Sequence, residues 1–91
     1  MDKTISMPLN LVGRQVHQFV YKIKQIPSSV YFKIDERMVN AKSLIGVFSA
    51  NVERGQEVTI SVFNDDSKQA EIDIKEVEKI IKEMAVSEDG I

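Results

Sequence analysis

The spacing of the hydrophobic residues changes repeatedly along this chain, and this change constrains the fold more than any other feature. Apolar side chains first recur with the spacing of one helical face, at Val12, Val16, Phe19, Val20 and Ile23. Pro27 is expected to end that helix, and the following segment SSVYFKI alternates apolar and polar residues like a half-buried strand. A short chain with both patterns is predicted to combine strands and helices in one α+β unit.

The remaining segments complete the order of elements. Strands are predicted in TISMPL before the first helix, in MVNA after the turn DER, and in EVTISVF, which alternates most cleanly. A short helix is predicted within KSLIGVFSANV, and a last helix carries Ile74, Val77, Ile80, Ile81 and Met84. The order β-α-β-β-α-β-α predicts an open-faced α+β sandwich, with an antiparallel four-stranded sheet and three helices on one face.

Polar residues at the expected helix starts predict how each helix is capped. Asn10 is expected to cap the first helix and Ser43 the second. Asp73 and Glu76 have the spacing of a capping box for the last helix, while Asp65 and Asp66 are expected in a solvated turn. The segment 68–72 fits either the first turns of the last helix or an extension of the preceding strand.

Composition excludes several classes of function. The 91 residues suit a single domain over residues 1–91, and a net charge of −2 offers no large positive field for nucleic acid. The absence of cysteine and the single histidine predict no disulfide, no metal site and no cofactor. No apolar run approaches the roughly 20 residues of a membrane span, so a soluble, cytoplasmic domain is expected.

Two residues of the first helix are candidates for chemistry. His17, the only histidine, lies well away from the apolar face, and no nucleophile accompanies it by spacing. It fits either an exposed helix residue or a phosphoryl acceptor. Arg14 lies near the helix start, where it is either a solvated side chain or a contact for an anion or a partner.

Ser43 is the most informative polar residue. It fits a helix cap and also a phosphorylation site, and the two roles are compatible because a phosphate at a helix start is favoured electrostatically. Three large apolar residues follow it on a short helix: Leu44, Ile45 and Phe48. They form a partner-docking patch if they are exposed and part of the core if they are buried.

The segment VNAKSLIGVFSANVERGQEVTISV, residues 39–62, resembles the regulatory-serine region and following strand of HPr, the histidine-containing phosphocarrier family of the bacterial sugar phosphotransferase system. The residues at family positions are Asn40, Lys42, Ser43, Gly46 and Gly55. The resemblance extends from about residue 5 to residue 62, and the element order predicted above matches the HPr-like fold.

The family's active-site motif, Gly-Leu-His-Ala-Arg-Pro-Ala, corresponds here to NLVGRQV, residues 10–16. Val12 stands at the position of the phosphorylated histidine and has no nitrogen to accept a phosphoryl group, while Gln15 replaces the proline. No catalytic residue is therefore expected. His17 lies five residues beyond Val12, about 7.5 Å along the helix axis and about 140° around it, so a displaced phosphocarrier role for His17 is the alternative.

The resemblance implies that Ser43 is phosphorylated by HPr kinase/phosphorylase. It also implies that Leu44, Ile45 and Phe48, with Arg14, contact a transcription regulator or phosphotransferase-type enzymes. The chain is similar in this respect to the Crh subgroup, which lacks the histidine and acts in carbon catabolite repression as a seryl-phosphorylated co-regulator. A non-catalytic regulatory protein is therefore expected. A partner-binding domain without either phosphorylation is a third possibility, and the oligomeric state is left open.

Overall fold

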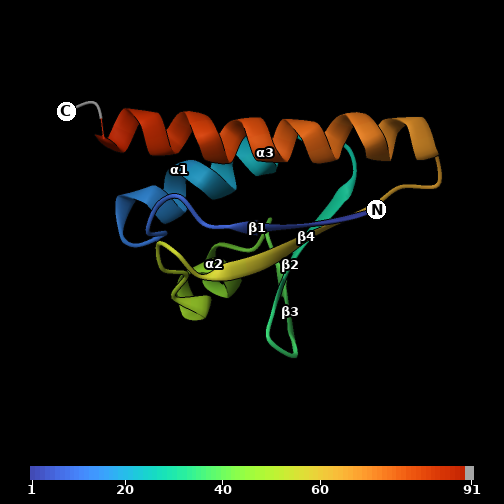
Figure 1. Cartoon of the computed structure of the whole chain (residues 1–91). Helices are drawn as coiled ribbons and strands as arrows, with labels where there is room; N and C mark the ends of the chain where they lie inside the picture. Colours follow the sequence, from blue (N-terminus) through green and yellow to red (C-terminus); the bar gives the residue numbers. More distant parts are fainter. Residues whose placement is uncertain (90–91) are drawn as a thin grey trace.

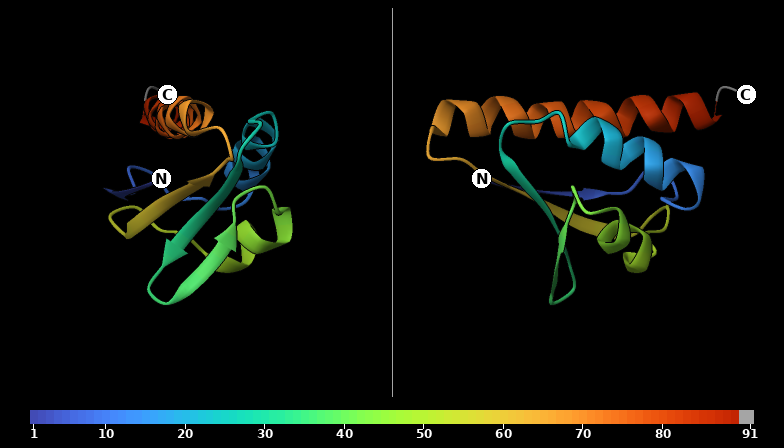
Figure 2. Two further views of the ribbon diagram at one scale, coloured as in Figure 1. Left: turned by 90° about the vertical axis from the view of Figure 1, so that its right-hand side faces the viewer. Right: turned by 180° about the vertical axis from the view of Figure 1, so that it is seen from behind.

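The computed structural model describes residues 1–89 and has the predicted order of elements. These are β1 (Asp2–Ser6), α1 (Arg14–Ile23), β2 (Ser29–Ile34), β3 (Arg37–Asn40), α2 (Leu44–Ala50), β4 (Glu57–Phe63) and α3 (Ser67–Asp89). The strands form one antiparallel sheet in the order β1-β4-β2-β3. The helices cover one face of this sheet, with α1 and α3 running side by side in opposite directions (Figures 1 and 2). The α+β open-faced sandwich is confirmed.

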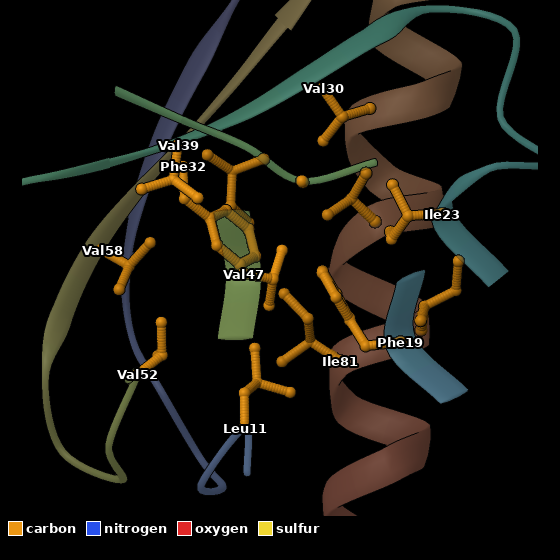
Figure 3. Packing of buried hydrophobic residues seen from close by; sticks show 14 of the residues in the cluster. Leu11, Phe19, Ile23, Val30, Phe32, Val39, Val47, Val52, Val58 and Ile81 are labelled. Carbon is orange, nitrogen blue, oxygen red and sulfur yellow. The ribbon is translucent and has the colours of Figure 1, made fainter. Parts of the chain in front are cut away.

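The core lies between the sheet and the helices. Alternate residues of β2 and β4 point into it, and α1 contributes its predicted face, whose buried members are Val16, Phe19, Val20 and Ile23. Figure 3 shows Phe19 and Ile23 among the buried side chains of this core, and the rings of Phe19 and Phe32 lie 5.3 Å apart between centroids. The other face of the sheet is open, and there Thr4 and Thr59 share a hydrogen bond of 2.8 Å across β1 and β4.

The start of α1 differs from the prediction. The helix begins at Arg14 rather than Val12, and Val12 is 45% exposed, whereas Leu11 is buried. Leu11 is held in place because its amide donates to the carbonyl of Val52 at 2.9 Å. Asn10 does not cap the helix. Its Oδ1 accepts instead from the backbone amide of Arg54 at 2.7 Å, so it joins two loops.

The predicted strand before this helix is also shorter and earlier than expected. β1 ends at Ser6, before Pro8, although Met7 and Leu9 are buried as their alternation predicted. The chain beyond the strand stays close to the loop before β4, where the amide of Met7 donates to the carbonyl of Gln56 at 2.9 Å. Met7 is therefore held by a contact between loops rather than by sheet pairing.

The third helix begins earlier than its capping box predicted. Residues 68–72 form its first turns, and the carboxylate of Asp66 caps it by accepting from the amides of Lys68 and Gln69 at 3.0 and 3.3 Å. Asp66 is thus a cap rather than only part of a solvated turn. The capping box at Asp73 and Glu76 was wrong, since Asp73 lies inside the helix and is 3% exposed. Its carboxylate accepts tertiary hydrogen bonds from Ser28 instead.

The described part of the chain has neither a membrane-spanning helix nor a cluster of metal ligands. None of the helices in residues 1–89 has the length and apolar composition of a membrane span. Within the same range, no three side chains among histidine, aspartate and glutamate gather as ligands for a metal ion.

Candidate functional site

The start of α1 is where the sequence resemblance predicts the counterpart of a reactive histidine. Val12 points its aliphatic side chain outward, and Gly13 precedes the helix with φ 52° and ψ −123°, a conformation that an L-residue rarely adopts. The amide of Gln15, which a proline would lack, donates to the carbonyl of Val12 at 3.1 Å. The turn therefore exposes the hydrocarbon side chain of Val12, and one amide near the helix start, that of Gln15, is already hydrogen-bonded.

Arg14 and His17 lie on α1 with their side chains exposed. Both line a groove of about 1070 Å³, which is also bordered by Leu44 of α2 and by Glu83 and Met84 near the end of α3. The structure therefore brings Arg14 and His17 to the same groove as one member of the predicted apolar patch. The predicted position of His17 away from the buried face of α1 is confirmed.

Ser43 caps α2 as predicted. Its Oγ accepts from the amide of Gly46 at 3.1 Å, and the side chain is half-buried. Gly46 has a spatial reason to be glycine, because an added Cβ would lie 3.2 Å from both Cβ and Oγ of Ser43. The glycine therefore leaves the space in which the serine hydroxyl meets the helix amide.

The loop before Ser43 is well defined by local hydrogen bonds. Asn40 accepts twice, with its Oδ1 from the amide of Lys42 at 2.9 Å and with its carbonyl from the amide of Ser43 at 3.0 Å. The amide of Ala41 donates to the carbonyl of Val30 in β2 at 2.9 Å. Ser43 is thus carried on a turn that continues directly from the edge strand β3.

Leu44, Ile45 and Phe48 are exposed, and together we name them the α2 patch. Their exposed fractions are 37%, 79% and 64%, whereas Val47 and Ala50 on the other side of the same helix are buried. The sequence left open whether these three residues belong to the core, and the structure places them outside it. Contiguous exposed apolar side chains of this size are typical of interaction surfaces.

The surface around the α2 patch has an unbalanced charge. Neither residues 3–34 nor residues 37–52 contain an aspartate or glutamate, so α1 carries its cations without acidic neighbours on its own segment. The helix α2 itself has no charged residue, and Glu83 of α3 is an acidic side chain that borders the groove. The cations of α1 and its end are Arg14, Lys22 and Lys24. Fourteen acidic residues against 12 basic ones make the whole chain slightly acidic, so this cationic surface is a local feature.

Comparison with known proteins identifies the family. The model of the PTS-HPr family, described as the PTS HPr component phosphorylation site, matches residues 2–83. The chain belongs to the HPr family. It is 32% identical to the HPr-like protein Crh of Bacillus subtilis (strain 168) over 66 residues. These aligned residues make up 72% of this chain and 78% of that protein. It is 30% identical over 67 residues to the phosphocarrier protein HPr of Lysinibacillus sphaericus, which covers 74% and 76%.

Solved structures agree with this membership. The crystal structure of HPr-C-His from Thermoanaerobacter tengcongensis superimposes with a TM-score of 0.75 at 30% identity, covering 90% of this chain and 91% of that one. The HPr family consists of phosphocarriers of the phosphotransferase system rather than catalytic enzymes. The match extends well beyond residues 5–62, where the resemblance was seen in the sequence, and includes most of α3.

Two residues at these helix starts, Gly13 and Lys42, have structural roles that could not be predicted from the sequence. Gly13 lies inside the helix predicted from Val12, although a glycine near a helix start can indicate a turn with positive φ, and Gly13 has φ 52°. Lys42 gave no signal beyond its family position. Its Nζ donates to the carbonyl of Ile26 at 2.6 Å, a contact between residues 16 positions apart that no local pattern announces.

Proposed function

We propose that this HPr-family protein is a regulatory module controlled by phosphorylation of Ser43 and does not transfer a phosphoryl group through a histidine. The observation that carries the proposal is the arrangement at the start of α2. There the hydroxyl of Ser43 is half-buried against Gly46 and the exposed α2 patch follows directly. At the start of α1, the residue matching the family histidine is Val12, whose side chain has no atom that could carry a phosphoryl group.

Phosphorylation would change the surface at one defined point. The Oγ of Ser43 would attack the γ-phosphorus of ATP, the bond from that phosphorus to the β,γ-bridging oxygen would break so that ADP leaves, and the hydroxyl proton would be released. The phosphoserine would carry a charge of about −1.5 to −2. A phosphate oxygen can accept the hydrogen bond that the Gly46 amide now donates to the Ser43 hydroxyl. The modified serine would place this negative charge on a surface whose own segments contain no carboxylate.

The α2 patch and Arg14 would form the docking surface. The proposed partners are HPr kinase/phosphorylase and either a transcription regulator of carbon catabolite control or a phosphotransferase-type enzyme. Ile45 and Phe48 are the most exposed members of the patch, and burying such side chains supplies most of the binding free energy of small interfaces. Because such partners act in the cytoplasm of bacteria, we place this protein there.

The decisive test is incubation with HPr kinase and ATP, followed by intact-mass and peptide mass spectrometry. We expect one added phosphate, on Ser43. Ser49 lies exposed on the same helix, so the Ser49→Ala variant is a matched control that should be phosphorylated like the wild type. A protein that gains no phosphate would contradict regulation by phosphorylation. It would leave a constitutive docking domain, which is supported by the exposure of the α2 patch without phosphorylation.

A second candidate function is a phosphocarrier that uses His17. It is supported by the exposure of His17 and by its place beside Arg14 in the same groove. Phosphoenolpyruvate and the first enzyme of the phosphotransferase system would then label the protein in an acid-labile way, and the label would disappear in His17→Ala. We expect no labelling of the wild type, because His17 lies more than a helical turn from the position at which the family carries its phosphoryl group.

A further inference from the structure

Lys42 directly precedes Ser43, yet its side chain is used inside the molecule. Its Nζ donates to the carbonyl of Ile26 at 2.6 Å in a partly buried position. This carbonyl lies just after the last turn of α1, where the amide of Ile26 itself donates to the carbonyl of Ile23 at 3.0 Å. Pro27 follows and has no amide to offer, and a cation at the carboxyl end of a helix is favoured by the helix dipole.

The segment that receives Lys42 is firmly anchored on its other side. Ser28 is 1% exposed, and its amide and hydroxyl donate to Oδ2 of Asp73 in α3 at 3.1 and 2.5 Å. The side chains of Asn64 and Gln69 complete this buried cluster, donating to Ser28 Oγ at 3.0 Å and to Asp73 Oδ1 at 2.8 Å. The loop between α1 and β2 is therefore a rigid support, packed against α3 and satisfied in its polar groups.

We propose that Lys42 is a positioning residue for Ser43. Its ammonium group holds the turn that carries the serine against the α1–β2 loop, which is anchored by the buried Ser28, so that the hydroxyl is presented in one orientation. The local hydrogen bonds to Asn40 shape this turn, but they do not tie it to α1, and Lys42 supplies that tie. The role in the reaction rests on the proposed phosphorylation of Ser43.

The alternative role of a lysine beside a modified serine is that of a free cation recognised by the kinase or by a partner. The structure disfavours that role, because the ammonium donates to the carbonyl of Ile26 in a partly buried hydrogen bond. The two roles make different predictions. A positioning lysine affects the order of the turn in the isolated protein, whereas a recognised cation affects only the complex.

The experiment compares Lys42→Met, which keeps a side chain of similar length but removes the ammonium group, with the matched control Lys24→Met. Lys24 lies at the end of α1, near the acceptor of Lys42, so its loss changes the charge equally without removing this hydrogen bond. Hydrogen exchange by NMR is measured at the amides of Ser43 and Gly46, with the amides of β4 as an internal standard for the fold. Phosphorylation by HPr kinase is measured as separate kcat and KM.

We expect Lys42→Met to speed exchange at Ser43 and Gly46 about tenfold, since a hydrogen bond to a charged group is lost, while β4 is unchanged. The kcat/KM for Ser43 should fall by a similar factor. Lys42→Arg should recover part of both effects, and Lys24→Met should change neither.

Slower phosphorylation of Lys42→Met with unchanged exchange would overturn the proposal and make Lys42 a recognised cation. Equal effects of Lys42→Met and Lys24→Met would also overturn it. If the wild type is not phosphorylated but its exchange depends on Lys42 as expected, the proposed function fails while the positioning of Ser43 by Lys42 stands on the exchange data.

Discussion

The starts of α1 and α2 make an informative pair, because the sequence resemblance predicts that each matches a phosphorylated position of the HPr family. At the start of α2, Ser43 caps the helix with its own side chain. At the start of α1, the residue before the helix is Gly13, and no side chain caps it. The side chain of Val12, which is predicted to match the family histidine, is exposed and caps nothing, whereas the side chain of Ser43 caps α2. Capping of α2 can therefore account for a serine at position 43 even if it is never phosphorylated. Experiments must separate the capping role from phosphorylation.

The largest expected effect comes from removing the hydroxyl while keeping the cap. Asn replaces Ser well as a helix cap, so Ser43→Asn should change the free energy of unfolding by less than about 0.5 kcal/mol. It should abolish phosphorylation by HPr kinase completely, as measured by intact mass, whereas Val12→Ala should leave phosphorylation intact. Phosphate on the Ser43→Asn protein would show that another residue is the acceptor.

A smaller but still large effect is expected at the α2 patch. Ile45→Asp places a charge where an apolar contact is proposed and should weaken binding to HPr kinase at least about tenfold. Val86→Asp is the control, because Val86 is similarly exposed, at 70% against 79%, but lies on α3. Titration calorimetry measures both. Equal affinities of the two variants would remove the α2 patch as the docking surface.

The two glycines at these helix starts should separate stability from phosphorylation. Gly13→Ala forces a side chain into φ 52° and should lower the free energy of unfolding by about 1–3 kcal/mol, measured by urea denaturation, without affecting phosphorylation of Ser43.

Gly46→Ala should lower the free energy of unfolding less than Gly13→Ala, because alanine gains about 1 kcal/mol of helix propensity over glycine. Its Cβ would crowd Ser43, so phosphorylation should slow. The reverse pattern would contradict the functional assignment of the two sites.

The smallest effect is expected at His17. Its side chain is exposed on α1 and makes no contact that stabilises the described part of the fold, so His17→Ala should change the unfolding free energy by less than about 0.5 kcal/mol. Phosphorylation of Ser43 should be unchanged. A clear loss of phosphorylation in His17→Ala would extend the functional surface along the groove and reduce the contrast between the two helix starts.

The order of elements, the fold class and the cap at Ser43 could be predicted from the sequence, because each rests on local periodicity or on a polar residue next to a helix. The start of α1 could not. Leu11 and Val12 are adjacent and both apolar, and periodicity does not tell which of them enters the core. The contact of Leu11 with Val52 decides it, and these residues lie far apart in the sequence. The same limit applies to Asp73, whose spacing to Glu76 imitates a cap although its partner Ser28 is 45 residues away.

The sequence by itself determined that this chain folds as an HPr-like sandwich and that Ser43 begins a helix, and it predicts that Val12 stands at the family histidine position. Only the tertiary structure decided that Val12, Leu44, Ile45 and Phe48 face solvent and that Lys42 is held against the end of α1. The physical reason is that local patterns specify which helix or strand a segment forms. Exposure and long-range hydrogen bonds depend on which segments pack together, and that is settled only when the whole core closes.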